Sequence, residues 1–160
     1  MGASGWEYVT EYKGSVEESL AVLHEQEFAE LYGNDDEYGS IEELWADGEF
    51  MGAEGTHSIL DIRRVVHTTA MPSEHVVEDY FTLRPLPADR IVHHFGSDRP
   101  TPERFQEVLD ESHAAHRPFP HHDPVETLLD ECRMRWTGVF VALYTGDEKT
   151  HVGIFGFSGD

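Results

Sequence analysis

Two segments near the C-terminal end of the sequence constrain the fold most. They read WTGVFVALY (residues 136–144) and THVGIFGF (residues 150–157), and both are rich in β-branched and aromatic residues. The connection between them contains Gly146 and Asp147, which favour a tight turn. This arrangement predicts an antiparallel β-hairpin. Because the sequence ends three residues after Phe157, we expect its last strand to lie inside a sheet rather than in a loose tail.

The first third of the sequence predicts a strand followed by two helices. Residues 6–12, WEYVTEY, alternate side chains with the period of two that is typical of a half-buried strand. Ser15 begins a capping box, and the helix that follows should end at Gly33 in the left-handed conformation. Ser40 and Glu43 repeat the capping-box pattern ahead of a shorter helix.

The middle of the sequence combines strand-like and helix-like segments. Residues 56–66 and 75–83 are dominated by β-branched and aromatic residues, and we expect them to form two antiparallel strands. Residues 88–96 have the apolar spacing of a short helix. Thr101 followed by Pro102 predicts the start of another helix, because proline at the first helical position gives up an amide that would be unpaired anyway.

Together these elements predict a fold class but no reaction. We expect one α+β domain, residues 1–160, with an antiparallel sheet of about five strands and helices packed on one face. The sequence contains no glycine-rich phosphate loop after a strand, no nucleophile elbow and no HExxH helix. The common signatures of enzymes are therefore absent, and whether the protein catalyses a reaction stays open.

Charge is the most informative bulk property of the sequence. It contains 32 acidic and 11 basic residues, which gives a formal net charge of −21. Fifteen of the acidic residues but only one basic residue, Lys13, fall within residues 1–54. Such asymmetry disfavours direct binding of nucleic acid or of an anionic membrane and favours a basic protein partner. The alternative explanation is a surface adapted to a saline solvent.

The charge pattern leads to the first functional hypothesis, an acidic non-enzymatic binding protein. We expect an inhibitor or immunity-like protein that masks the basic surface of a partner such as a nuclease or a nucleic-acid-binding protein. An accessory subunit of a larger assembly would have the same sequence features, and the oligomeric state stays open. The expected partner-binding residues are six acids and one tyrosine: Glu17, Glu25, Glu30, Asp35, Asp36, Glu37 and Tyr38. Aromatic residues usually dominate an interface, and the nearest further ones are Tyr32 and Trp45, although Trp45 also fits a core position.

A histidine-rich segment, SHAAHRPFPHHDP at residues 112–124, leads to the alternative hypothesis of a small, metal-assisted enzyme. If the helix that starts at Thr101 continues to His116, then Asp110, His113 and His116 lie near one helical face. His122 could complete a site for zinc or another divalent metal within residues 110–123. The ligand spacing does not match known zinc motifs, and a solvated helix end explains the same residues. We therefore expect no cofactor.

Three further features carry smaller expectations. His57 and Asp61 would share one side of a strand, where they could form a general base with its orienting carboxylate, but a satisfied polar histidine is the plainer explanation. The single cysteine, Cys132, excludes an intrachain disulfide and is expected to be a buried, unreactive thiol. Neither a signal-like N-terminus nor a membrane-length apolar run is present, so we expect a cytoplasmic protein without membrane binding.

Overall fold

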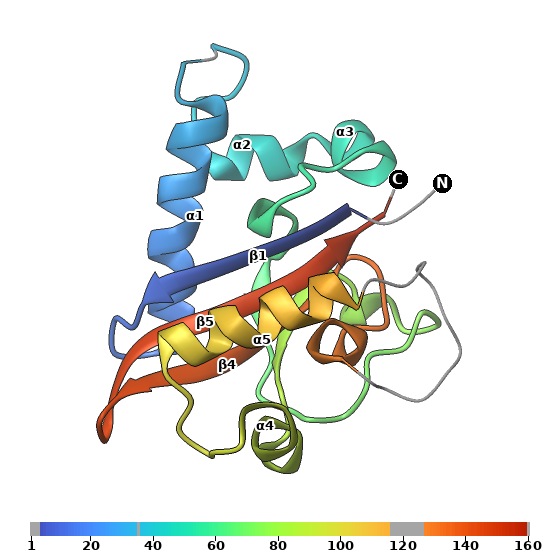
Figure 1. Cartoon of the computed structure of the whole chain (residues 1–160). Helices are drawn as coiled ribbons and strands as arrows, with labels where there is room; N and C mark the ends of the chain where they lie inside the picture. Colours follow the sequence, from blue (N-terminus) through green and yellow to red (C-terminus); the bar gives the residue numbers. More distant parts are fainter. Residues whose placement is uncertain (1–3, 35, 116–126, 160) are drawn as a thin grey trace.

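Helices and one mixed β-sheet make up the α+β fold of the chain. A computed structural model describes residues 4–34, 36–115 and 127–159. The strands of the sheet follow the order β1-β5-β4-β3-β2 (Figure 1). The strands are β1 (Ser4–Glu11), β2 (Arg64–Val65), β3 (Thr82–Pro85), β4 (Thr137–Thr145) and β5 (Glu148–Ser158). The α-helices are α1 (Val16–Tyr32), α2 (Ile41–Ala46), α3 (Gly48–Ala53), α4 (Ala88–Phe95) and α5 (Pro102–Ala114), and the 3-10 helices are η1 (Ile59–Asp61), η2 (Val77–Asp79) and η3 (Leu128–Glu131).

The C-terminal hairpin is the centre of the sheet. β4 and β5 pair antiparallel, and β5 also pairs antiparallel with β1, so the last strand lies inside the sheet as expected. Gly156 sits opposite Gly138 on β4 and opposite Trp6 on β1. A Cβ atom at Gly156 would lie 2.3 Å from the Trp6 ring, so this register requires glycine there. The same pairing brings the two ends of the described chain together, with Ser4 opposite Ser158 (Figure 1).

The prediction of a purely antiparallel sheet is wrong at β2 and β3, which are parallel to each other and, through β3, to β4. The segment expected as a strand over residues 56–66 contains η1 and then only the two residues of β2. The segment over residues 75–83 contains η2, and β3 begins only at Thr82. The long connection between β2 and β3 returns to the end of the sheet at which β2 began, so the two strands run in the same direction. β-branched residues do not mark strands here, because Ile59 is buried in η1 and Val76 and Val77 are exposed at η2.

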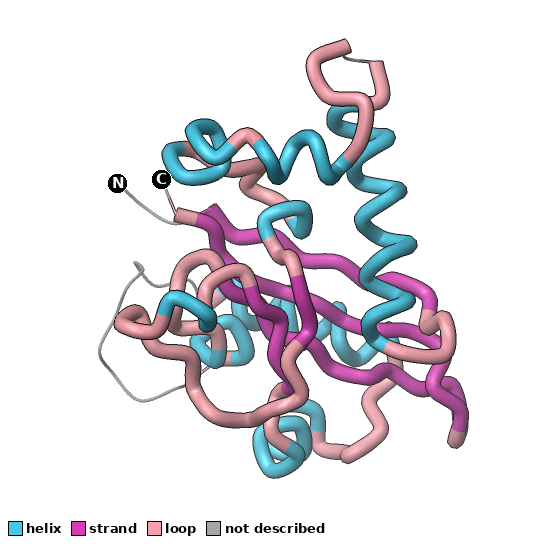
Figure 2. Tube along the Cα trace, turned by 180° about the vertical axis from the view of Figure 1, so that it is seen from behind, coloured by secondary structure: helices cyan, strands magenta, loops and turns pink. Residues whose placement is uncertain are grey.

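Helices cover both faces of the sheet, not one face as predicted. α1 and η1 pack on one face, in a core that includes Leu23, Ile62 and Ile154. α4, α5 and η3 pack on the other face, with Phe105 and Phe155 at the centre of the second core. Figure 1 shows α5 in front of the sheet, and α1 comes to the front in the reverse view of Figure 2. The apolar run VFVAL in β4 fits a strand that is covered on both sides.

Most of the helix boundaries follow the expected capping chemistry. The hydroxyls of Ser15, Ser40 and Thr101 each accept a hydrogen bond from the backbone amide three residues on, at 3.1, 3.2 and 3.1 Å. The expected left-handed end of α1 is wrong, because Gly33 has a right-handed φ of −64°. Gly96 supplies such an end for α4, with a φ of 75°. No helix in the described parts of the chain is long and apolar enough to span a membrane.

Candidate functional site

The expected partner-binding acids on α1 are exposed, but they do not form one compact patch. The buried side of α1 carries Leu20, Leu23 and His24. At about 100° per residue, Glu25 lies near the centre of the opposite side, whereas Glu17 and Glu30 fall on opposite margins of it. The carboxylate of Glu17 also contacts Nε2 of His67 at 2.6 Å. Glu25 and Glu30 therefore remain the acids of α1 that best suit a partner.

The loop after α1 continues this acidic surface. Asp36 and Glu37 are exposed, and Asp35 lies outside the described residues. The expected contact residue Tyr38 is half-buried, and its hydroxyl donates a hydrogen bond to Asp47 at 2.7 Å. This hydrogen bond to a carboxylate raises the pKa of Tyr38 to about 12.

The aromatic side chains near this surface pack against one another. Tyr38 makes an edge contact with Tyr32, with ring centroids 5.8 Å apart. The indole of Trp45 donates a hydrogen bond to the carbonyl of Leu60 at 2.8 Å. These rings belong to a separate apolar cluster around Leu44, Met51 and Leu60. They stabilise the α1–α2–α3 region, and Trp45 occupies the core position that its sequence context also fits.

The structure brings together only part of the predicted histidine site. α5 ends at Ala114, and both His116 and His122 lie outside the described residues. Nε2 of His113 contacts Oε2 of Glu7 on β1 at 2.8 Å, and Asp110 accepts a hydrogen bond from Gln106. Within the described ranges, no group of three or more His, Cys, Asp or Glu side chains is arranged to hold a metal ion. The metal site over residues 110–123 stays a prediction.

Asp61 is the centre of a buried polar network that the sequence did not reveal. It is fully buried, and its carboxylate accepts hydrogen bonds from the amide and hydroxyl of Thr56, at 2.6 and 2.8 Å, and from the amide of His57 at 2.9 Å. The hydroxyl of Ser158 also donates to it, and accepts a hydrogen bond from the indole of Trp6. Asp61 lies in η1 and accepts a hydrogen bond from the backbone amide of His57, so the two residues do not share one side of a strand, and their use as a general base stays only an alternative.

Three non-glycine residues close to this network have positive φ angles. They are His57, Phe81 and Trp136, with φ values of 54°, 63° and 66°. The amide of Phe81 donates to the carbonyl of Trp136 at 2.7 Å, and the two residues directly precede β3 and β4. Their rings meet edge to face at 5.9 Å. Such backbone conformations cost free energy and gather at functional sites, which makes this end of the sheet a region of interest.

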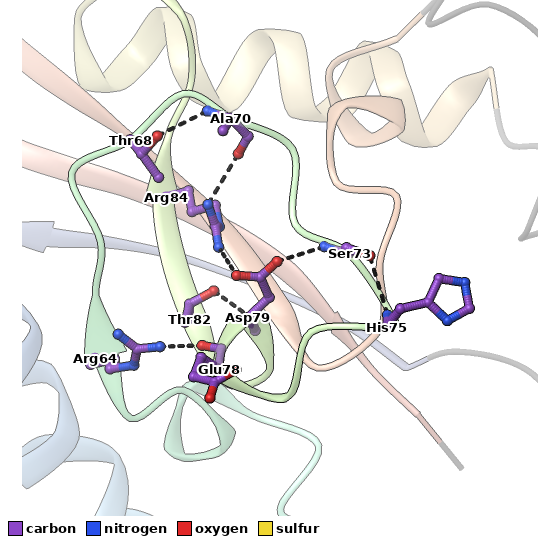
Figure 3. A network of polar contacts seen from close by, with 9 residues as sticks. All are labelled: Arg64, Thr68, Ala70, Ser73, His75, Glu78, Asp79, Thr82 and Arg84. Carbon is purple, nitrogen blue, oxygen red and sulfur yellow. Dashed lines mark hydrogen bonds and ion pairs between the residues drawn. The ribbon is translucent and has the colours of Figure 1, made fainter.

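A cavity of about 400 Å³ borders β3 on the sheet face that α5 covers. Its wall includes the loop over residues 69–72, the start of β4, and η3. Arg84 on β3 is a buried charged residue of this wall, with 8% of its surface exposed. Figure 3 shows its guanidinium between the carbonyl of Ala70 and the carboxylate of Asp79, at 3.1 and 2.7 Å. An arginine within the apolar stretch FTLRPL was the sequence signal for this site.

Two further polar groups of the cavity wall, on Arg90 and Cys132, are paired or inert. Nε of Arg90 donates to Oε1 of Glu131 at 2.8 Å. The thiol of Cys132 is buried and donates to the carbonyl of Thr137, and burial raises the pKa of this thiol to about 11. Cys132 is therefore protonated at neutral pH, as expected for a structural cysteine.

Comparison with known protein families, curated proteins and solved structures finds no match to this chain. Its function has to be argued from the charges, contacts and cavity described above.

Proposed function

We propose that the protein is a non-enzymatic binding protein that masks the basic surface of a protein partner, in the manner of an inhibitor or an immunity protein. The surface that engages the partner is the exposed side of α1 with the loop that follows it. We call it the acidic surface and define it by four residues: Glu25, Glu30, Asp36 and Glu37.

The observation that carries the proposal is the lack of local neutralisation at this surface. Glu25, Glu30 and Asp36 make no ion pair with any basic residue in the described parts of the chain. Arg99 and Arg104, by contrast, are paired with acids, as in the Arg99–Asp147 pair at 2.5 Å. Unneutralised like charges create a negative potential that speeds the encounter with a cationic partner.

An interface also needs apolar contact area, because exposed charge pairs contribute little net affinity. The expected aromatic anchors are packed within the chain, but Leu31 is adjacent to Glu30 and is 48% exposed. We therefore assign Leu31 as the apolar contact of the acidic surface.

The test compares charge reversal at two places on the molecule. One variant carries Glu25→Lys, Glu30→Lys and Asp36→Lys. The matched control carries Asp98→Lys, Glu103→Lys and Asp110→Lys, which are also exposed but lie on or beside α5. The partner is the protein that co-purifies from the native host at low salt and leaves at high salt.

We expect the first variant to bind this partner about tenfold or more slowly at low ionic strength, and with a weaker salt dependence. The control variant should keep at least most of the wild-type association rate. If the first variant folds normally and associates as fast as the wild type, the acidic surface only solvates the protein and the proposal is wrong.

A further inference from the structure

The cavity beside β3 has the construction of a small-molecule site. At about 400 Å³ it falls within the size range of ligand pockets, and nonpolar residues form much of its wall, including Met71, Pro72, Leu86 and Val139. It lies on the sheet face that α5 covers, whereas the acidic surface lies on α1, on the other face (Figures 1 and 2). The two sites are therefore separate.

Successive side chains of β3 point to opposite faces of the sheet, which explains why a charged side chain reaches this cavity. Leu83 packs in the core beneath α1, so the next residue, Arg84, projects to the opposite face. Asp79 accepts a hydrogen bond from the amide of Ser73 at 2.8 Å and also holds Nη2 of Arg84 (Figure 3). The guanidinium is thus fixed by the loop at Ala70 and by Asp79 at the end of η2.

This guanidinium has N–H donors to spare. Nη1 and Nη2 of Arg84 each use one of their two N–H groups in the hydrogen bonds above, and the buried Nε has no partner among the described residues. A buried charged donor without an acceptor is costly, and an oxygen atom from a ligand would satisfy it.

We propose that the cavity binds a small organic carboxylate with an apolar body, whose carboxylate accepts a hydrogen bond from the guanidinium of Arg84. The apolar body would lie against Met71, Leu86 and Val139. A charge-assisted hydrogen bond to a fixed guanidinium is the usual way to hold such a group.

The charges around the cavity favour a single negative charge on the ligand. Arg84 is already paired with Asp79, and Arg90 is already paired with Glu131. Asp89, Glu131 and Arg133 also line the cavity, and the two acids would repel a doubly charged group such as a phosphate monoester more than a singly charged one. A monocarboxylate places one charge beside Arg84 without this repulsion.

The first test is calorimetric titration of the whole protein with octanoate and, as the uncharged match, octanamide. We expect octanoate to bind at least about tenfold more tightly than octanamide. Arg84→Gln should remove this preference, whereas Arg104→Gln, at a half-exposed position on α5, should keep it. Octanoate that does not bind, or that binds no better than octanamide, overturns the proposal.

A second measurement uses the wild-type protein and so does not depend on how Arg84→Gln folds. An octanoate analogue with a photoreactive diazirine on its chain should label residues 69–72 or 131–139, and excess octanoate should suppress the labelling. Labelling confined to other segments overturns the proposal. The charge-reversed variant of the acidic surface should bind octanoate like the wild type, which separates a failure here from a failure of the proposed function.

Discussion

His57, Phe81 and Trp136 adopt positive φ angles although none is glycine. Their neighbours hold them there: the Asp61 carboxylate fixes the amide of His57, and the carbonyls of Trp136 and Phe157 fix the amides of Phe81 and Trp136. The cost of such a conformation, about 1–2 kcal/mol for a residue with a Cβ atom, is offset by these hydrogen bonds. The sequence carries no signal for it, because the same residues are common in strands.

The strain at His57 can be measured by comparing two substitutions. His57→Gly should be more stable than His57→Ala by about 1 kcal/mol, because glycine adopts a φ of 54° without steric cost. At His93, an exposed position in α4, the order should reverse. His93→Ala should be the more stable variant by about 1 kcal/mol, because alanine stabilises a helix interior more than glycine does. Urea unfolding of the four variants measures both differences. Equal stability of the two variants at position 57 would show that the backbone there is relaxed.

Among the candidate site residues, those on regular helices could be placed from the sequence. Glu25 is exposed as expected, because the period of α1 fixes which side faces the sheet. Arg84 and Asp61 could not be placed in the same way, since their roles depend on which loop and strand meet them. The sequence assigned Asp61 to a strand, whereas η1 turns its carboxylate back onto two backbone amides.

At the level of elements, the β4–β5 hairpin was predictable and the β2–β3 pair was not. A hairpin is a local structure, and the turn at Gly146 and Asp147 together with the flanking residues specifies it. The direction of β2 relative to β3 depends on the path of residues 66–81, which include η2 and carry no periodic signal. Which helices cover the second face of the sheet likewise depends on the path of the chain through α4 and α5, and no local pattern specifies that path.

The packing of Trp6 across the sheet makes a prediction about these strands. A Cβ atom at Gly156 would lie 2.3 Å from the Trp6 ring and 2.6 Å from the carbonyl oxygen of Thr137. Gly156→Ala should therefore lower the free energy of unfolding by about 2 kcal/mol or more, because the ring has to leave its position. Gly52→Ala in α3 is the control: no heavy atom lies within 4 Å of its Cβ, and the helix should gain up to about 1 kcal/mol. A Gly156→Ala variant with an unchanged melting temperature would show that Trp6 moves aside at little cost.

At the scale of the whole molecule, a net charge of −21 on 160 residues opposes compaction through self-repulsion. The repulsion is uneven, because Glu25, Glu30 and Asp36 lack cationic partners among the described residues whereas Arg99 and Arg104 are paired with acids. We therefore expect the stability of the protein to depend on where its charges lie as well as on its net charge.

The salt dependence of stability can separate the effect of where the charges lie from the effect of the net charge. Added NaCl should raise the melting temperature of the wild type, because at 0.1 M it screens repulsion between exposed acids that lie more than about 10 Å apart. The variant with Glu25, Glu30 and Asp36 changed to lysine and its control with Asp98, Glu103 and Asp110 changed to lysine both have a formal net charge of −15, since each change adds two units to −21. We expect the first variant to lose more of the salt-induced increase than the control, because no Lys or Arg adjoins Glu25, Glu30 or Asp36 in the sequence, whereas Arg99 and Arg104 directly follow the control acids Asp98 and Glu103. Calorimetric melting in a series of NaCl concentrations measures this. An equal loss in the two variants would mean that total charge alone sets the response, and the acidic surface would then have no local potential with which to attract a basic partner.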